Sequence, residues 1–153
     1  MIESLISFSI ATLFLALSPG PDNLYVIAQS LANGTKSGIA TTIGLISGCI
    51  VHTSLLAFGV SALIVVNESL FFAIKVLGAL YLCYLAFKVF KSDSVLHINS
   101  ENVTRKSLKD LFVQGFFMNV LNPKVTIFFL AFFPGFLFSE TMNTIWQFYI
   151  LGG

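Results

Sequence analysis

The 153-residue chain is 56% hydrophobic and only 10% charged, and its formal net charge is +1. A soluble domain of this length needs a polar surface and carries about a quarter charged residues, so the composition excludes such a domain and predicts an integral membrane protein. The near-neutral charge, with no basic stripe along the chain, also excludes nucleic acid as a partner.

Four apolar runs are long enough to cross a bilayer as helices, which takes about 20 residues each. They cover residues 5–32, 38–66, 70–90 and 111–138, and a fifth run begins at about residue 145. The runs do not alternate in polarity and are much longer than the roughly 10 residues of a membrane barrel strand. The sequence therefore predicts an all-α, polytopic helical bundle that forms one transmembrane domain over residues 1–153.

The basic residues outside the apolar runs lie in two of the connections. Lys36 separates the first run from the second, and the polar stretch 91–110 holds four more Lys and Arg residues. The other connections hold Glu68 and Glu140 and no Lys or Arg. Because cytoplasmic loops are enriched in Lys and Arg, we expect 91–110 to be a cytoplasmic loop and the N-terminus to lie outside.

The first apolar run is interrupted by S-P-G-P-D-N, residues 18–23. An Asp near the middle of a span costs about 2.5–3.5 kcal/mol on insertion scales, so Asp22 is expected to face protein or a water-filled cavity. The two prolines free backbone carbonyls, and the half-helix that begins after them exposes N–H groups and the positive end of its dipole. This arrangement predicts a site for a small zwitterion, with the N–H groups toward a carboxylate and Asp22 toward an amine.

The fourth run repeats this interruption at Asn122-Pro123-Lys124, which supplies a helix N-cap, a proline at the first helical position and a mid-span cation. Broken helices in corresponding positions predict a 3+3 inverted repeat with a secondary transporter's site at the bilayer midplane. A proline kink without function is the alternative. The predicted substrate-binding residues are Ser18, Pro19, Gly20, Pro21, Asp22, Asn23, Asn122, Pro123 and Lys124.

The second run carries small residues four apart, Ala40, Gly44 and Gly48, followed by His52. Such a stripe lets another helix backbone approach closely, so it predicts that His52 lies on a packed face. His52 then either donates to a carbonyl or titrates during transport, and both readings stay open. His52 and Asp22 are the two candidates for proton coupling.

Three other features have simpler explanations. The phenylalanine-rich run 128–136 covers several helix faces, which is typical of a packing or lipid-facing surface rather than a binding site. Lys75 lies near the end of its span, where the ammonium can snorkel to the interface. Cys49 and Cys83 are expected to be small buried hydrophobes, with a disulfide or redox pair as the alternative.

Four blocks of the sequence resemble the LysE/RhtB family of amino-acid exporters. They are S-P-G-P-D-N, G-I-A-T-T-I-G-L-I-S-G-C-I-V-H, K-V-L-G-A-L-Y-L-C-Y-L-A-F and G-F-F-M-N-V-L-N-P-K. The resemblance implies a six-span protein of the bacterial inner membrane that exports amino acids or close derivatives, driven by the proton gradient. It also implies that the last spans are missing from this chain, which ends at the start of a fifth. The family's signature positions fall on Pro19, Gly20, Pro21, Asp22, His52, Asn122, Pro123 and Lys124.

The expected partners are an amino acid, protons and the lipid bilayer, with no cofactor and no metal, and homo-oligomerisation is left open. The chain is not expected to be an enzyme. Three other functions remain as alternatives: a non-transporting scaffold or assembly protein, an exporter of metal cations, and a membrane thiol oxidoreductase. The last would use Cys49 and Cys83, although no C-x-x-C motif is present.

Overall fold

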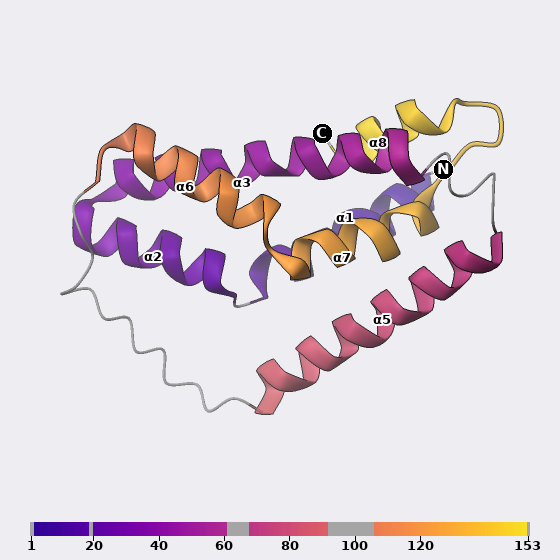
Figure 1. Ribbon diagram of the computed structural model, residues 1–153, viewed down its shortest axis with the longest axis horizontal. Helices are drawn as coiled ribbons and strands as arrows, with labels where there is room; N and C mark the ends of the chain where they lie inside the picture. Colours follow the sequence, from indigo (N-terminus) through magenta and orange to yellow (C-terminus); the bar gives the residue numbers. More distant parts are fainter. Residues whose placement is uncertain (1, 19, 61–67, 92–105, 153) are drawn as a thin grey trace.

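The computed structural model describes residues 2–18, 20–60, 68–91 and 106–152, and within these ranges the regular structure is entirely helical (Figure 1). The protein is thus an all-α membrane protein, as the sequence predicts. The helices are α1 (Ile2–Leu17), α2 (Pro21–Asn33), α3 (Thr35–Leu55), η1, a π-helix (Leu56–Val60), α5 (Glu68–Lys91), α6 (Leu108–Val120), α7 (Pro123–Ala131), η3, a 3₁₀ helix (Phe133–Phe136), and α8 (Thr144–Gly152).

Two stretches of helix in the described ranges, Thr35–Gly59 and Ser69–Lys88, are each long and apolar enough to cross a membrane. Two bent pairs bring this number to four if each pair forms one span. The axes of α1 and α2 differ by 59°, and Leu108–Val120 and Pro123–Phe136 differ by 51°. The first and fourth apolar runs are therefore broken where the sequence places proline.

The polar stretch 91–110 contributes residues to both neighbouring helices. Lys91 ends α5, and α6 already begins at Leu108. Ser107 caps this helix, since its hydroxyl oxygen accepts from the backbone N–H of Asp110 at 3.1 Å and its hydroxyl donates to the Asp110 carboxylate at 2.7 Å. Residues 92–105 and 61–67 lie outside the described ranges, as does Pro19.

The predicted small-residue stripe of α3 packs against α6. A Cβ atom on Gly44 would collide with the backbone carbonyl of Phe112, and one on Gly48 would collide with the side chain of Asn119. The contact is reciprocal, because a Cβ on Gly115 of α6 would collide with the carbonyl of Thr41. Glycine on both helices therefore brings the two backbones together, as small residues do between membrane helices.

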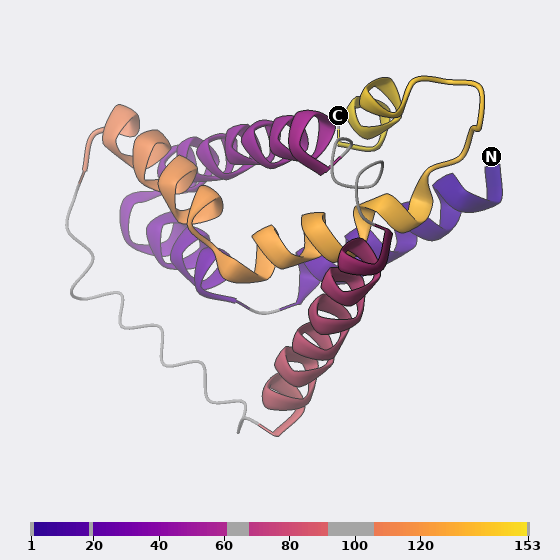
Figure 2. The same ribbon diagram turned by 45° about the vertical axis from the view of Figure 1, so that its right-hand side comes forward.

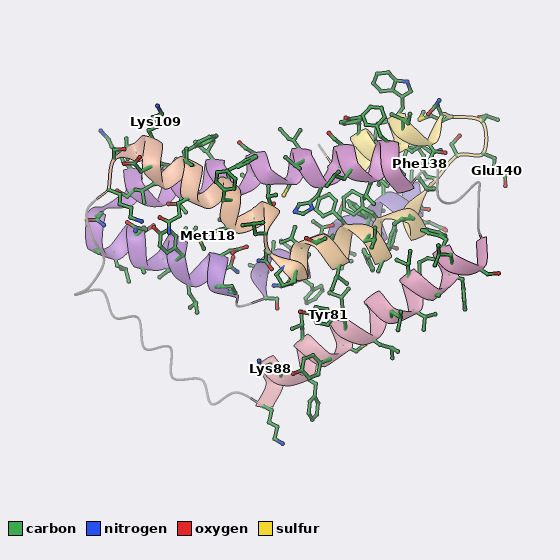
Figure 3. The ribbon with its side chains drawn as sticks, viewed as in Figure 1. Tyr81, Lys88, Lys109, Met118, Phe138 and Glu140 are labelled. Atoms are coloured by element: carbon green, nitrogen blue, oxygen red, sulfur yellow. The ribbon has the colours of Figure 1, made fainter. Side chains whose placement is uncertain are left out.

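The two broken spans change direction in the middle of the molecule. Figure 1 shows α3 along one side of the molecule, with α2 and α6 near the end where α3 begins and α1 and α7 near its other end. The two polar ends are also distinct, since Lys109 and Glu140 lie at opposite ends of the molecule (Figure 3). The break between α1 and α2 and the break between α6 and α7 both lie about midway between these two ends (Figure 1).

The C-terminal part of the helix α5 projects away from the other helices (Figure 2). It contacts α7, where a Cβ atom on Gly78 would collide with Ala131. Because most of α5 is uncovered, Cys83 is exposed, and the expectation that it is buried is wrong. Cys49 on α3 is half-buried, and both thiols are free. The Lys75 ammonium lies 4.8 Å from the centroid of the Phe71 ring, along the same helix.

The phenylalanines of α7 and η3 form much of the core. Phe128, Phe129 and Phe133 are all buried, and the rings of Phe129 and Phe133 stack with centroids 4.2 Å apart. Phe8 of α1 meets Phe133 edge-on at 4.7 Å, which ties the first half of one broken span to the second half of the other. The packing role predicted for residues 128–136 is correct, although three of these rings also face the cavity described below.

Candidate functional site

The two helix breaks meet and are joined by side chains. Asn122 donates its amide N–H to the Asp22 carboxylate, with Nδ2 and Oδ2 2.6 Å apart. The carbonyl oxygen of the same side chain caps α7 by accepting from the backbone N–H of Lys124 at 2.9 Å. Asn122 is thus the N-cap that the sequence predicts, with Pro123 next to it, and it also connects this break to the start of α2.

The ammonium group of Lys124 crosses to the C-terminal end of α1. Its Nζ lies 3.2 Å from the carbonyl oxygen of Leu15 and 3.1 Å from that of Ser18. Asn23 supplements this cap by donating to the carbonyls of Ala16 and Ser18, at 2.8 Å and 3.2 Å. The last carbonyls of a helix lack partners in that helix and carry its negative dipole end, so a cation is stabilised there.

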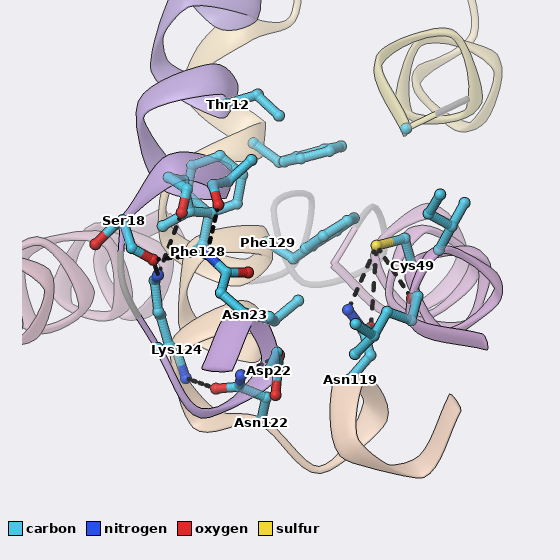
Figure 4. Close-up of a pocket in the computed structure, with 18 of the residues that line it drawn as sticks. Thr12, Ser18, Asp22, Asn23, Cys49, Asn119, Asn122, Lys124, Phe128 and Phe129 are labelled. Atoms are coloured by element: carbon cyan, nitrogen blue, oxygen red, sulfur yellow. Dashed lines mark hydrogen bonds between the residues drawn. The ribbon is translucent and has the colours of Figure 1, made fainter. Parts of the chain in front are cut away.

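A cavity of about 360 Å³, here called the junction cavity, opens beside this meeting point (Figure 4). The polar part of its lining comes mainly from the two breaks, α3 and α6, whereas the apolar part comes mainly from α1, α7, η3 and α8. Figure 4 shows Asn119 and Cys49 on one side and Asp22, Asn122 and Lys124 on the other. The lining used below consists of Phe8, Thr12, Ser18, Gly20, Asp22, Asn23, Cys49, Asn119, Asn122, Lys124, Phe128, Phe129, Phe133 and Leu151.

A second cavity, of about 600 Å³, lies between α5 and the pair α1 and α7. It shares Ser18, Gly20, Asn122 and Lys124 with the junction cavity. Pro21 and Pro123 line this second cavity rather than the first. The helix breaks therefore form the wall between two cavities.

The structure brings most of the predicted binding residues together. Six of them, Ser18, Gly20, Asp22, Asn23, Asn122 and Lys124, line the junction cavity. His52 lines neither of the two cavities and lies behind two residues of the junction cavity, Asn119 and Phe129. The imidazole is 4% exposed, its Nε2 lies 3.2 Å from the backbone oxygen of Asn119, and its ring centroid is 5.2 Å from that of Phe129.

Several residues of the cavity wall were not predicted as site residues. Asn119 and Cys49 line the cavity, and so do Phe128, Phe129 and Phe133, which the sequence predicts to form a packing or lipid-facing surface. A signal for Asn119 is present in the sequence, because it is a polar carboxamide in an apolar run, three residues before the predicted site residue Asn122. The phenylalanine run covers too many faces for its sequence to show which rings reach the cavity.

Comparison with known proteins identifies the family of the chain. The chain is 28% identical to the leucine efflux protein of Salmonella typhimurium (strain LT2) over 145 residues, which cover 95% of this chain and 68% of the relative. It is 30% identical to the uncharacterized membrane protein YrhP of Bacillus subtilis (strain 168) over 143 residues, which cover 88% of this chain and 68% of that relative. No solved structure matches. The sequence pattern of the LysE type translocators matches residues 13–152, and the chain therefore belongs to that family.

Proposed function

We propose that this protein is a secondary transporter that exports amino acids or close derivatives across the bacterial inner membrane by proton antiport. Its family and the leucine efflux relative support amino-acid export. The observation that carries the proposal is the hydrogen bond between Asp22 and Asn122, which joins two half-helix starts between the ends of the molecule. Half-helix ends at the midplane hold substrates in transporters with inverted repeats, so we also propose a 3+3 repeat.

The two charges at the junction suit the two ends of an amino acid. Asp22 is half-buried, and among the described residues only one of its carboxylate oxygens has a hydrogen-bond partner. The other oxygen is the proposed acceptor for the substrate's ammonium group. Lys124 is the proposed partner of the carboxylate, because hydrogen bonds between charged groups are stronger than those Lys124 makes to the uncharged carbonyls of Leu15 and Ser18.

The rest of the junction cavity suits an apolar side chain. Phe8, Phe129, Phe133 and Leu151 line it, and its volume of about 360 Å³ lies in the lower part of the range of ligand pockets, roughly 300–1,000 Å³. An aliphatic amino acid such as L-leucine combines a zwitterionic head with a side chain that these groups would hold. We therefore propose apolar amino acids as the substrate class.

Proton coupling requires a group that titrates near neutral pH. Of the two candidates, Asp22 is assigned to the substrate's amine, which leaves His52 for the proton. Histidine is suited to this role because its ordinary titration falls close to physiological pH. A movement of the cavity wall when substrate binds would also reach the imidazole, because its Nε2 contacts the backbone of Asn119, which lines the cavity.

The placement of charges supports an orientation with the N-terminus outside. Lys36, Lys106 and Lys109 lie where α3 and α6 begin, whereas Glu140 lies at the opposite end (Figure 3). In a variant without Cys49 and Cys83, a cysteine introduced at Ser69 should react with an impermeant thiol reagent in intact cells. One introduced at Lys109 should react only after the membrane is permeabilised, and the reverse pattern would overturn the orientation.

Counterflow in proteoliposomes tests the proposed function. Vesicles that hold the purified protein and a high internal concentration of unlabelled L-leucine should transiently accumulate external labelled L-leucine, whereas protein-free vesicles should not. An imposed pH gradient should then drive net movement of L-leucine. If no amino acid of any class gives counterflow, amino-acid export is wrong, and if counterflow occurs without a response to the gradient, proton antiport is wrong.

A further inference from the structure

Asn119 lies in the last turn of α6 and faces the junction cavity across from Asp22 (Figure 4). Its side chain is buried, with 6% of the residue exposed. The backbone around it is fixed on two sides, because Gly48 packs against its Cβ and its carbonyl oxygen lies 3.2 Å from the His52 imidazole. A buried carboxamide therefore projects into the cavity from a rigid position.

This carboxamide lacks strong hydrogen bonds within the described part of the chain. Its Nδ2 lies 3.6 Å from the Cys49 sulfur, and that sulfur lies 3.9 Å from its Oδ1. A thiol is a weak donor and a weak acceptor, whereas a carboxamide offers two N–H donors and an oxygen with two lone pairs. Most of the hydrogen-bonding capacity of Asn119 is thus available to something in the cavity.

The two most deeply buried carboxamides of the described residues, in contrast, have strong hydrogen-bond partners. Gln147, 1% exposed, accepts from the backbone N–H groups of Phe138 and Ser139 at 2.8 and 2.9 Å and donates to the carbonyls of Ser139 and Met142 at 2.7 and 2.9 Å. Gln29, also 1% exposed, donates to Tyr25 and accepts from Asn33, both at 2.9 Å. Folded proteins pair their buried polar groups, and among the described residues the hydroxyls of Thr12 and Thr53 are buried without a partner. Asn119 differs from these in offering both donors and acceptors to the cavity, with only a weak thiol contact, which points to a ligand.

We propose that Asn119 is a substrate-binding residue that recognises the head group of the transported amino acid. Its Oδ1 accepts from the substrate's ammonium group together with Asp22, and its Nδ2 donates to the substrate's carboxylate. This inference rests on the proposed function, since it requires that an amino acid occupy the junction cavity. The carboxamide discriminates in favour of a zwitterion because it presents an acceptor and a donor side by side.

Cys49 provides a direct reporter of this contact. Its thiol lines the same cavity and lies beside the Asn119 carboxamide, so a head group bound there blocks access of a small alkylating reagent. Cys83 is exposed on α5 and lines neither described cavity. In a protein with Cys83→Ser, only Cys49 can be alkylated. A protein with Cys49→Ser shows whether L-leucine affects the alkylation of Cys83.

The test measures the rate at which N-ethylmaleimide modifies Cys49 in proteoliposomes at increasing L-leucine concentration. L-leucine should slow the reaction in the Cys83→Ser protein and leave Cys83 in the Cys49→Ser protein unaffected. Adding Asn119→Leu, which is close in size, should raise the half-protecting concentration about tenfold or more, because hydrogen bonds to both charged ends are lost. Asn119→Ala, which is smaller and cannot crowd Gly48, should have the same effect.

Gln29→Leu is the matched control, since it also replaces a buried carboxamide but lies outside the junction cavity. It should lower thermal stability without changing the half-protecting concentration, whereas the Asn119 variants should show the opposite pattern. Protection of Asn119→Ala at the same L-leucine concentration as its parent would overturn the role of Asn119 while leaving the proposed function intact. If no amino acid protects Cys49 even in the parent, both the proposed site and the role of Asn119 are wrong.

Discussion

Replacing Lys124 with glutamine is expected to abolish export while leaving the amount of protein in the membrane nearly unchanged. The substitution removes the only positive charge among the described residues that line the junction cavity. Losing one partner of a buried charge pair typically costs about 2–5 kcal/mol, which corresponds to roughly 30-fold or more in affinity. Glutamine keeps an N–H donor for the carbonyls of Leu15 and Ser18, so the cap on α1 is largely retained.

The measurement is L-leucine counterflow together with the thermal stability of the purified protein. Lys75→Gln is the matched control, because this lysine lies over Phe71 on α5 and lines neither of the two cavities. It should transport normally. If Lys124→Gln instead loses stability and membrane level along with transport, the lysine serves mainly to cap α1, and its assignment to the substrate's carboxylate is wrong.

Asp22→Asn is expected to eliminate substrate binding at every pH. As the proposed partner of an ammonium group, Asp22 must be charged when substrate binds, and asparagine has nearly the same shape without the charge. In the unaltered protein the Asn122 Nδ2 lies 2.6 Å from the Asp22 carboxylate. The oxygen of the new side chain can still accept from it, so the contact between the two breaks should survive. Counterflow and gradient-driven efflux should therefore be lost together, in a protein that remains folded.

A proton carrier at this position would give a different result. A group that must alternate between its charged and neutral forms is needed only when transport is coupled to the pH gradient. Asp22→Asn would then still exchange labelled for unlabelled L-leucine across the membrane and would lose only the response to the gradient. Measuring both processes in the same vesicles separates the two roles of Asp22. Retained exchange would mean that a residue other than Asp22 binds the substrate's amine.

Much of the fold can be predicted because it follows from local rules. The length of each apolar run predicts a membrane helix. Pro21 and Pro123 predict where two of these helices are interrupted, because proline cannot continue a helix. Asn122 was predicted as an N-cap from the Asn-Pro pair, and its side chain does cap α7. The packed face of α3 follows equally from the spacing of Gly44 and Gly48, and α6 is the helix that fills it.

The site itself depends on contacts between distant segments, which local rules do not determine. The sequence predicts a cation at the second break, but not that its ammonium lies on carbonyls of α1. It offers Asn119 as one of several polar residues in apolar runs, and only the arrangement of α3 and α6 places this one in the cavity. The exposure of Cys83 could not be predicted for the same reason, because it depends on which helices cover α5.

Calorimetric titration of L-leucine into the purified protein and into its Asp22→Asn variant tests the central claim most directly. That claim is that the meeting point of the two broken helices binds the head group of an amino acid, with Asp22 as partner of the amine. The expected result is saturable binding to the unaltered protein and no measurable binding to Asp22→Asn, whose melting temperature should stay close to the parent's. Equal affinity in the two proteins would contradict the claim.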